Sequence, residues 1–303
     1  MSGMCEGRIC VVTGAGRGIG REHALMLASE GAKVVVNDLG GAMDGSGGDA
    51  SPAQQVVDEI KGMGGEAVAN HDDISDWEGA QKLINTAVET FGGLDAVINN
   101  AGILRDRMLT NMTEEEWDAV IKVHLKGTFA PSRWAAAYWR ERSKAGETNN
   151  GRIINTASVS GIYGNVGQTN YGAAKAGIAS FTIIAARELK RYGVTVNAIA
   201  PTALTRMTEG LGLGQASDEQ KEMMNPRWIA PVATWLASTQ SSDVTGRVIE
   251  ASGQGLAIAE SWHRGPEAGP IDDPKQLDDA IRPLLAKARP NATMNGQDVK
   301  EMP

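Results

Sequence analysis

The sequence predicts a single doubly wound α/β domain, in which a parallel sheet of about seven strands carries helices on both faces. Short β-branched segments alternate along the chain with segments of helical periodicity. A glycine-rich turn joins the first strand to the first helix, and no internal repeat or change of composition interrupts the alternation before about residue 255. We therefore assign residues 1–255 to one domain and residues 256–303 to a C-terminal extension made of a loop, one helix and a frayed end.

The composition limits the function classes. The chain has 303 residues, of which 42% are hydrophobic and 22% charged, as in ordinary globular proteins. Its net charge of −8 argues against nucleic acid or an anionic membrane surface as the main partner, and no apolar run approaches the roughly 20 residues that span a bilayer. Cys5 and Cys10 are the only cysteines and lack metal-ligand spacing. We expect free thiols, no metal and a cytoplasmic protein, since no signal-peptide pattern opens the chain.

The first elements form a nucleotide-binding pattern. A strand at residues 8–13 runs into a glycine-rich turn at residues 14–20, a helix follows, and a second strand at residues 33–38 ends in a carboxylate. Strand, glycine turn, helix and strand with a terminal acid make up the dinucleotide-binding unit of Rossmann folds, where glycines let the backbone approach the pyrophosphate. The alternative is a tight surface turn. The candidate cofactor contacts of this unit are Gly14, Arg17, Gly18, Ile19, Gly20 and Asp38.

Asp38 favours NAD over NADP. It follows Gly20 at the interval expected for the acid that accepts hydrogen bonds from the adenosine ribose hydroxyls, and its charge would repel a 2′-phosphate. Arg17 is the counter-signal, because a basic residue in this turn could contact such a phosphate. A solvated strand end is the alternative for Asp38.

The middle of the chain continues the alternation. After a glycine-rich insert between Leu39 and Ser51, we expect helices at 52–63 and 76–91 and strands at 66–70 and 94–98. Asp73 lies where it could meet the adenine amino group or cap the next helix. Asn99 and Asn100 end a strand, where they can bond backbone groups and brace neighbouring strands. We count as further cofactor contacts Asp73, Ile74, Asn100, Ala101 and Gly102.

Later elements follow the same rule. Thr113 and Glu116 form a capping box that opens a long helix, which carries His124 and ends near Arg142. The remaining elements are strands at 152–154, 193–201 and 246–251 and helices at 171–192, 225–236 and, in the extension, 272–288. The extension could cap a substrate cleft, cross to a neighbouring subunit or pack on its own domain.

Ser158, Tyr171 and Lys175 are candidate proton-handling residues. Ser158 follows a buried strand, and Tyr171 and Lys175 lie one turn apart on one helix face. A free phenol titrates near about 10, too high for a base at neutral pH, and a nearby ammonium lowers this value. Ser158 could then donate a hydrogen bond to a substrate oxygen while Tyr171 takes or returns its proton. Ordinary helix-surface residues are the alternative.

Five motifs in order give residues 7–255 a resemblance to the short-chain dehydrogenase/reductase family: Thr13-Gly14-x-x-x-Gly18-x-Gly20, Asn99-Asn100-Ala101-Gly102, Ser158, Tyr171-x-x-x-Lys175 and Asn197-x-x-x-Pro201. The resemblance implies that Tyr171 is the general acid/base and that Ser158 polarises the carbonyl or carbinol oxygen. Lys175 would lower the pKa of Tyr171 and hold the nicotinamide ribose.

Two positions depart from that family's pattern. Many members place an Asn in the long helix to link the Lys to solvent through a water, and here the matching residue is His124. An imidazole can pass protons, or it can simply be buried between helices. The family often has Pro-Gly after the sixth strand, where this chain has Pro201-Thr202, so the Thr that contacts the carboxamide is best matched to Thr205, with Pro201 beside the cofactor.

A narrower resemblance links four segments to the dehydrogenase part of peroxisomal multifunctional enzyme type 2: residues 36–41, 102–107, 123–127 and 160–165. It implies a stand-alone, NAD-dependent enzyme that oxidises a (3R)-hydroxyacyl-CoA to a 3-oxoacyl-CoA in fatty-acid or sterol side-chain breakdown. The alternatives are a 17β-hydroxysteroid-type dehydrogenase and a non-catalytic dinucleotide-binding protein.

The same resemblance bears on partners. It implies a homodimer or homotetramer, formed through the helix that carries Tyr171 and the helix before it. Arg105 and Arg107 could contact a CoA phosphate, or they could form a surface ion network with Asp106.

Overall fold

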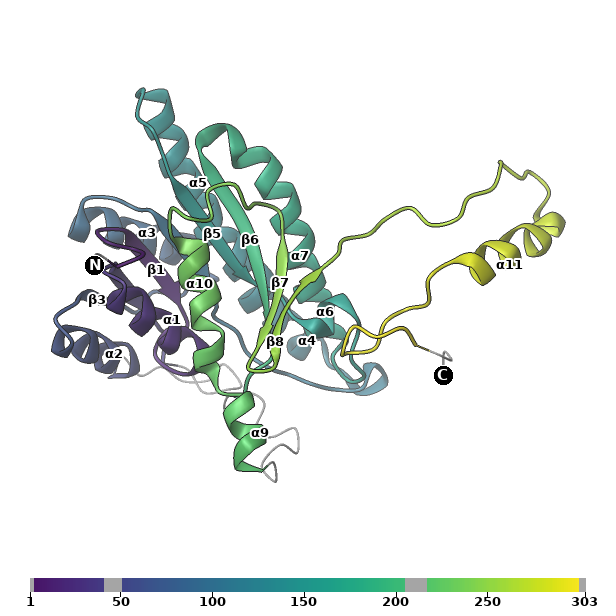
Figure 1. The fold of residues 1–303 in the computed structure, drawn as a ribbon, viewed down its shortest axis with the longest axis horizontal. Helices are drawn as coiled ribbons and strands as arrows, with labels where there is room; N and C mark the ends of the chain where they lie inside the picture. The colour runs from purple at the N-terminus through teal and green to yellow at the C-terminus, as the bar shows by residue number, and fades with distance from the viewer. Residues whose placement is uncertain (1–2, 41–50, 205–216, 300–303) are drawn as a thin grey trace.

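The computed structural model describes residues 3–40, 51–204 and 217–299. Within these residues one sheet has the strand order β3-β2-β1-β4-β5-β6-β7-β8 (Figure 1). The strands are β1 (Ile9–Thr13), β2 (Lys33–Asn37), β3 (Glu66–Asn70), β4 (Ala96–Asn99), β5 (Gly151–Thr156), β6 (Val194–Pro201), β7 (Val248–Ser252) and β8 (Gly255–Ala259). The expected fold class is confirmed.

The sheet has one strand more than expected. Strands β1 to β7 pair in parallel, whereas β8 turns back and pairs antiparallel with β7, from Ser252–Gly255 to Val248–Ala259. Most of β8 is exposed, so it lacks the buried apolar pattern that marks the other strands. It also spans the boundary expected at residue 255, and the division into a domain and an extension stays a prediction.

Helices cover both faces of the sheet. On one face lie α1 (Gly18–Ser29), α2 (Ser51–Gly62) and α10 (Ala230–Ala237), and on the other α3 (Trp77–Phe91), α5 (Gly127–Lys144) and α7 (Thr169–Leu189) (Figure 1). Within β1 the side chains alternate between the two cores: Cys10 and Val12 face the first set of helices, and Ile9 and Val11 the second. A strand buried on both faces is the usual state in parallel sheets.

The long helix expected from Thr113 to about Arg142 is interrupted. The capping box of Thr113 and Glu116 opens α4 (Glu114–Ile121), as predicted. A π-helical turn, η2 (Lys122–Lys126), then separates α4 from α5. Such turns often occur at functional sites, and this one carries His124.

Several short elements were not expected from the sequence. They are η1 (Leu109–Asn111), α6 (Val159–Ile162) and α9 (Asp218–Met223). The helices expected at 171–192 and 225–236 each include a 3₁₀ segment: η3 (Lys190–Tyr192) follows α7, and η5 (Pro226–Trp228) precedes α10.

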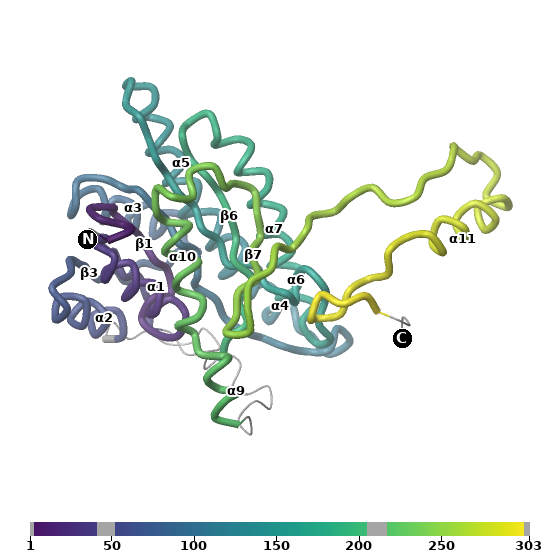
Figure 2. The backbone as a smooth tube through the Cα atoms, viewed as in Figure 1, coloured from purple at the N-terminus to yellow at the C-terminus, as the bar shows by residue number. Residues whose placement is uncertain are grey.

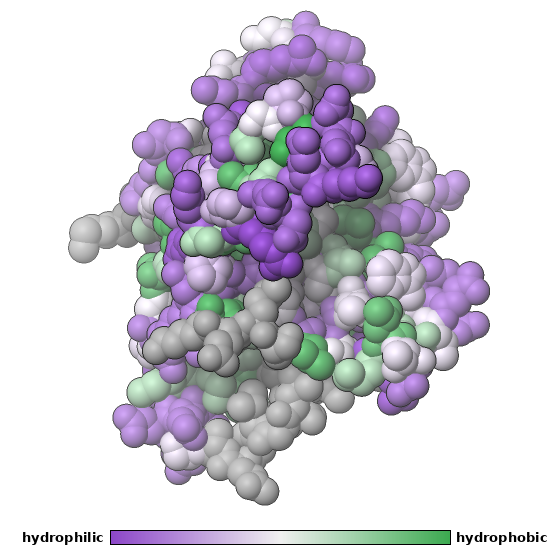
Figure 3. Space-filling model, turned by 90° about the vertical axis from the view of Figure 1, so that its right-hand side faces the viewer, coloured by the Kyte–Doolittle hydropathy of each residue, from purple (hydrophilic) through white to green (hydrophobic). Residues whose placement is uncertain are grey.

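Beyond β8 the chain leaves the body of the molecule as an arm. It carries η6 (Pro274–Gln276) and α11 (Leu277–Lys287), which corresponds to the expected helix at 272–288. Figure 2 shows α11 held away from the sheet and the chain then returning toward α6. The side that bears the arm is mostly hydrophilic, with separate small apolar patches (Figure 3).

Residues 289–298 of the arm contact one another. Ala292 and Asp298 form an antiparallel bridge, and Arg289 pairs with Asp298 at 2.9 Å.

The parallel topology brings the carboxyl ends of β1 to β6 to one edge, with the change of chain direction between β1 and β4. Ligands of open α/β sheets bind at this point. Among the described helices, none combines the length and apolarity needed to cross a membrane.

Candidate active site

The turn after β1 forms a cradle that a side chain would fill. Gly14 and Gly18 have φ of +61° and +55°, a region that favours glycine. A Cβ on Gly14 would lie 2.7 Å from the Cα of Ala101, and one on Gly20 would lie 2.2 Å from the Gly14 carbonyl oxygen. The backbone of the turn therefore packs closely on the loop after β4, and α1 begins directly at this crevice. Exposed Arg17 is its N-cap residue, and Ile19 packs partly buried against the core.

Asp38 is held against this turn. One carboxylate oxygen accepts a hydrogen bond from the Gly16 amide at 2.7 Å, and the other accepts one from the Gly40 amide at 2.7 Å. A carboxylate oxygen can accept two hydrogen bonds, so each keeps acceptor capacity. Glycine cradle, helix N-terminus and strand-end carboxylate thus converge, and together they fit the pyrophosphate and ribose of a dinucleotide. The insert at residues 41–50 lies outside the described residues.

The two asparagines at the end of β4 brace the sheet, as expected. Asn99 donates to the side chains of Asn155 and Ser132, both at 2.9 Å, which ties β4 to β5 and α5. Asn100 donates to the carbonyl oxygens of Thr13 and Gly14 at 3.1 Å. The β1, β4 and β5 ends are therefore fixed relative to one another.

The Thr13 hydroxyl adds a second tie between β1 and the loop after β4. It accepts hydrogen bonds from the backbone amides of Asn100 and Ala101, at 2.9 and 3.1 Å.

At the end of β3, Asp73 makes a local turn. Its carboxylate accepts hydrogen bonds from the amide and hydroxyl of Ser75, at 2.8 and 2.6 Å. The helix-cap alternative for Asp73 is wrong, because Asp76 caps α3 by accepting from the Gly79 amide at 2.8 Å. The adenine contact of Asp73 stays a prediction.

Three further candidate cofactor contacts are Ile74, Pro201 and Thr205, of which the structure describes the first two. Ile74 is buried, and a Cβ on Gly127 would lie 2.3 Å from its Cδ1, so α5 packs directly on it. Pro201 is the last residue of β6. Thr205 lies outside the described residues.

Ser158, Tyr171 and Lys175 come together as predicted. Ser158 is the N-cap of α6, and its oxygen accepts from the Ser160 amide at 3.1 Å, which leaves its O–H to donate. Tyr171 lies in the first turn of α7 and hydrogen-bonds the Ser158 side chain. The Lys175 Nζ lies 5.5 Å from the centroid of the Tyr171 ring and donates to the Thr156 carbonyl oxygen at 2.6 Å.

The electrostatics differ from the expectation that Lys175 lowers the pKa of Tyr171. Burial raises the pKa of Tyr171 to about 12; the hydrogen bond from Ser158 lowers it, and the charge of Asp106 adds to the rise. Burial also lowers the pKa of Lys175 to about 7. Lys175 is itself 3% exposed, so its charged form is disfavoured, and its Nζ donates to the Thr156 carbonyl oxygen.

His124 is buried between helices beside this group. Its Nε2 lies 2.7 Å from the Ile103 carbonyl oxygen, and its ring meets the Tyr171 ring edge-on at 5.1 Å. Burial lowers its pKa to about 3, so the imidazole is neutral. Its Nδ1 is buried without a partner among the described residues. A Cβ on Gly102 would lie 2.3 Å from the imidazole, so this glycine makes room for the ring. A proton relay through His124 stays a prediction.

The loop after β4 holds residues whose role sequence reasoning missed. Arg107 forms an exposed ion pair with Glu116 at 3.0 Å, but Asp106 does not join a surface network with it. Asp106 instead turns inward and accepts from the Gln168 amide group at 2.8 Å. No local sequence pattern indicates this contact, because it joins residues 62 positions apart in the chain.

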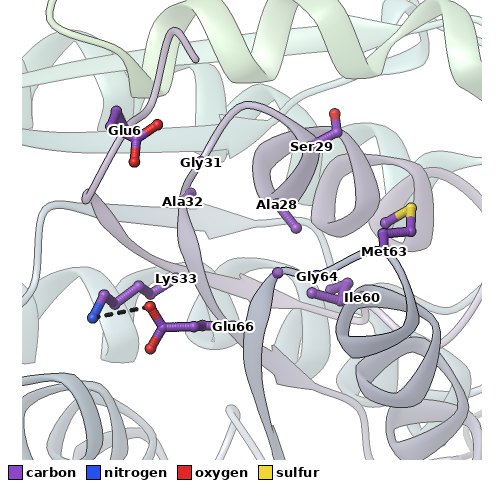
Figure 4. Close-up of a pocket in the computed structure, with 11 residues that line it drawn as sticks. Glu6, Ala28, Ser29, Gly31, Ala32, Lys33, Ile60, Met63, Gly64 and Glu66 are labelled. Carbon is purple, nitrogen blue, oxygen red and sulfur yellow. Dashed lines mark ion pairs between the residues drawn. The ribbon is translucent and has the colours of Figure 1, made fainter. Parts of the chain in front are cut away.

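A surface pocket of about 220 Å³ lies at the opposite edge of the sheet, away from these groups (Figure 4). Lys33 and Glu66, the first residues of β2 and β3, form an ion pair of 3.1 Å on its rim. No group of three or more metal-ligating side chains occurs in the part of the chain that the structure describes.

The family model described as short chain dehydrogenase matches residues 8–215. The chain belongs to this family. Hydroxyacyl-CoA dehydrogenase ChsB1 of Mycobacterium tuberculosis is 44% identical over 306 residues, which cover 97% of this chain and 93% of that protein. Peroxisomal multifunctional enzyme type 2 of Drosophila melanogaster is 44% identical over 274 residues, which cover 90% of this chain but 44% of that enzyme.

A solved structure is similar over nearly the whole chain. The crystal structure of a short chain dehydrogenase from Mycobacterium avium has a TM-score of 0.87 and 51% sequence identity, covering 99% of this chain and 100% of that one. The family and the relatives show that the chain of 303 residues is an oxidoreductase that acts on CH–OH groups of small molecules. Its family generally uses NAD or NADP.

Proposed function

We propose that this short chain dehydrogenase uses NAD to interconvert a (3R)-hydroxyacyl-CoA and a 3-oxoacyl-CoA in fatty-acid or sterol side-chain breakdown. Two similarities support the substrate class. The first is to a hydroxyacyl-CoA dehydrogenase, matched over 97% of this chain. The second is to two multifunctional enzymes, of which the match covers 44% and 33%. The observation that carries the chemistry is the convergence of Ser158, Tyr171 and Lys175 beside the glycine cradle.

The residues divide the work of proton transfer. A dinucleotide held by the glycine turn and Asp38 would supply the hydride acceptor or donor for the carbinol carbon. The Ser158 hydroxyl donates a hydrogen bond to the substrate oxygen and fixes its position. Tyr171 takes the alcohol proton in oxidation and returns it in reduction. Lys175, buried one turn away and held by Thr156, fixes the helix face on which the phenol is presented.

The pKa of Tyr171 determines how the rates of alcohol oxidation and of ketone reduction depend on pH. Because burial raises this pKa to about 12, the phenol is protonated at neutral pH, the form that ketone reduction needs. Alcohol oxidation needs the deprotonated form, so its rate should rise with pH up to that pKa.

The choice of NAD over NADP rests on Asp38. Its carboxylate lies on the amide of Gly16, where the adenosine ribose would meet the glycine turn. A fixed negative charge at that point repels a 2′-phosphate. Arg17, exposed at the start of α1, is the nearby basic residue that would favour one.

The test is NADH formation followed by absorbance. Purified enzyme is offered NAD or NADP with a (3R)-hydroxyacyl-CoA, its (3S) epimer or a free 17β-hydroxysteroid, and Tyr171→Phe is the control. NAD-linked turnover of the (3R) thioester that Tyr171→Phe loses by about 10²-fold or more supports the proposal. Turnover of the steroid alone, or activity unchanged in Tyr171→Phe, contradicts it. NAD binding without turnover of any of these would favour the non-catalytic dinucleotide-binding alternative.

A homodimer or homotetramer in the cytoplasm completes the proposal. Apolar side chains are exposed on the two helices expected to form the interface: Phe129 of α5 is 42% exposed and Ile184 of α7 is 53% exposed. Burying them against a second copy removes apolar surface from water. Light scattering after size exclusion at micromolar protein concentration should give two or four chain masses, and a monomer would contradict the interface.

A further inference from the structure

The short helix α6 has Ser158 at one end and Tyr163 at the other. Ser158 is its N-cap and Tyr163 its C-cap, and the Tyr163 amide donates to the Val159 carbonyl oxygen at 2.8 Å. The Ser158 carbonyl oxygen accepts from the amides of Gly161 and Ile162, at 3.0 and 3.1 Å. The helix is only about one turn long, so a displacement of its outer end at Tyr163 is transmitted directly to the serine.

The inner side of α6 packs on the helix that carries Tyr171 and Lys175. A Cβ on Gly161 would lie 2.5 Å from the backbone nitrogen of Ala176 and 2.7 Å from the Cβ of Lys175. The glycine therefore lets the two helices approach closely. Because α6 cannot move further toward α7, this contact acts as a pivot, and the orientation of α6 about it depends on how Tyr163 is held.

The side chain of Tyr163 bonds to the sheet. Its hydroxyl donates a hydrogen bond to the Glu250 side chain, across 87 positions of the chain. Glu250 lies in the middle of β7, where it is paired with Ala200 of β6 and Ala257 of β8. A strand paired on both sides is a rigid anchor. Burial and the bond to Glu250 raise the pKa of Tyr163 to about 12, so the hydroxyl keeps its proton at neutral pH.

The end of the arm covers the same phenol. It forms a turn in which the Thr293 amide donates to the Gln297 carbonyl oxygen at 2.7 Å, and Gly296 has a φ of +71°. A Cβ on Gly296 would lie 3.2 Å from the Tyr163 hydroxyl oxygen and 3.5 Å from the ring carbon that bears it. The chain that leaves the sheet after β8 thus returns to α6 (Figure 2), and its turn limits the access of water to the bond with Glu250.

We propose that Tyr163 is a positioning residue for Ser158: its bond to Glu250, covered by the end of the arm, fixes the outer end of α6 and thereby the direction of the serine hydroxyl. This inference rests on the proposed role of Ser158 as the donor to the substrate oxygen. A misplacement of about 1 Å in such a group can cost up to about 10²-fold in rate. The arm then has a role in catalysis without contacting the reacting atoms.

The test is the oxidation of a (3R)-hydroxyacyl-CoA by NAD in Tyr163→Phe, which keeps the ring beneath the arm and removes the bond to Glu250. We expect kcat to fall about tenfold. The KM for NAD should stay within about twofold of the wild-type value, because the glycine turn and Asp38 are not touched. Tyr192→Phe makes the same change in η3, beyond the other end of α7, and should keep the wild-type kcat.

Two substitutions at Glu250 test the bond from its other side. Glu250→Ala removes the acceptor and should lower kcat as Tyr163→Phe does, whereas Glu250→Gln keeps an oxygen that accepts from Tyr163 and should keep most of the activity. The double variant of Tyr163→Phe and Glu250→Ala should be no slower than either single variant. Because Glu250→Ala leaves α6 itself unchanged, a folding defect in Tyr163→Phe does not end the test.

The dependence on Ser158 separates positioning from a general structural role. Ser158→Ala removes the hydroxyl and should lower kcat by about 10²-fold or more. In that background Tyr163→Phe should change kcat by less than about twofold, because no hydroxyl is left to direct. A structural defect unrelated to Ser158 would lower kcat by the same factor in both backgrounds.

The contribution of the arm is tested at Gly296. Gly296→Ala places a methyl group against the Tyr163 hydroxyl, at a φ that disfavours any residue but glycine, and should lower kcat without raising the KM for NAD. Gly265→Ala in the same arm adds a methyl group where nothing lies within 4 Å, and should leave kcat unchanged.

The outcomes separate the two proposals. Absence of turnover in the wild type, or full activity in Ser158→Ala, overturns the proposed function itself. Loss of activity in Ser158→Ala together with wild-type kcat in Tyr163→Phe and Glu250→Ala overturns the role of Tyr163 alone, as does an equal loss from Tyr163→Phe in both backgrounds. Equal activity of Gly296→Ala and Gly265→Ala overturns the cover by the arm. A tenfold loss that Glu250→Gln avoids, and that disappears in Ser158→Ala, supports the inference.

Discussion

Lys175 should weaken the folded protein at neutral pH, and its replacement by Met should reveal this. The side chain is 3% exposed, and burial lowers its pKa from 10.5 to about 7. Met keeps the unbranched apolar stem and removes the ammonium. Residues retained for catalysis often cost stability in this way, so the variant should be inactive and, at neutral and acidic pH, more stable than the wild type.

The size of the effect follows from the two pKa values. Below pH 7 the lysine is charged in both folded and unfolded chains, and the full difference applies: from 10.5 to about 7 at about 1.36 kcal/mol per pH unit is about 5 kcal/mol of destabilisation. Between pH 7 and 10.5 the unfolded chain binds the extra proton, so wild-type stability rises with pH. Above 10.5 both forms are neutral and the cost vanishes. Losing the hydrogen bond to Thr156 costs the variant about 1–3 kcal/mol throughout.

The difference in free energy of unfolding between Lys175→Met and the wild type should therefore change sign as the pH rises. At pH 6 the free energy of unfolding of Lys175→Met should exceed that of wild type by about 2–4 kcal/mol, and above pH 10.5 it should fall below it by about 1–3 kcal/mol. Urea unfolding followed by circular dichroism at several pH values from about 6 to 11 measures this, with the m-value as the check on two-state behaviour. A difference that does not vary with pH would refute the argument, because it would mean that Lys175 is solvated when folded.

Two further predictions concern the cofactor site. Gly20→Ala places a methyl group 2.2 Å from the Gly14 carbonyl oxygen and should weaken dinucleotide binding at least tenfold by titration of protein fluorescence, whereas Gly62→Ala in α2, where a Cβ meets nothing within 4 Å, should not. Asp38→Ala should raise kcat/KM for NADP relative to NAD by about tenfold or more. Unchanged binding in the first variant, or an unchanged coenzyme ratio in the second, would contradict these assignments.

The sequence predicted the groups that a parallel sheet aligns by topology. Ser158, Tyr171 and the glycine turn lie at strand ends or the first turns of helices, so chain order and periodicity place them at one edge. Residues placed by tertiary packing could not be predicted in this way. Asp106 reads as part of a charged surface loop, and only the attachment of that loop to α7 turns it inward.

The π turn and the strand β8 could not be predicted from the sequence for the same reason, because contacts with other parts of the structure form them. The turn from Lys122 to Lys126 accommodates the His124 ring, which packs on Gly102. The strand β8 is formed by its antiparallel pairing with β7. Neither arrangement leaves a local periodicity.

Burial changes the pKa values of the site residues more than the pairing of charges does. Tyr171, Lys175 and His124 all have pKa values displaced toward their neutral forms, and for each the largest cause is burial. A lysine with a pKa near 7 is partly neutral at physiological pH, so it cannot by itself hold a phenolate there. The largest contribution to the Tyr171 pKa is thus its own burial, to which the charge of Asp106 adds. A site governed by a tight Tyr171–Lys175 ion pair would instead have the pKa of the tyrosine lowered and that of the lysine raised, the reverse of what burial does here.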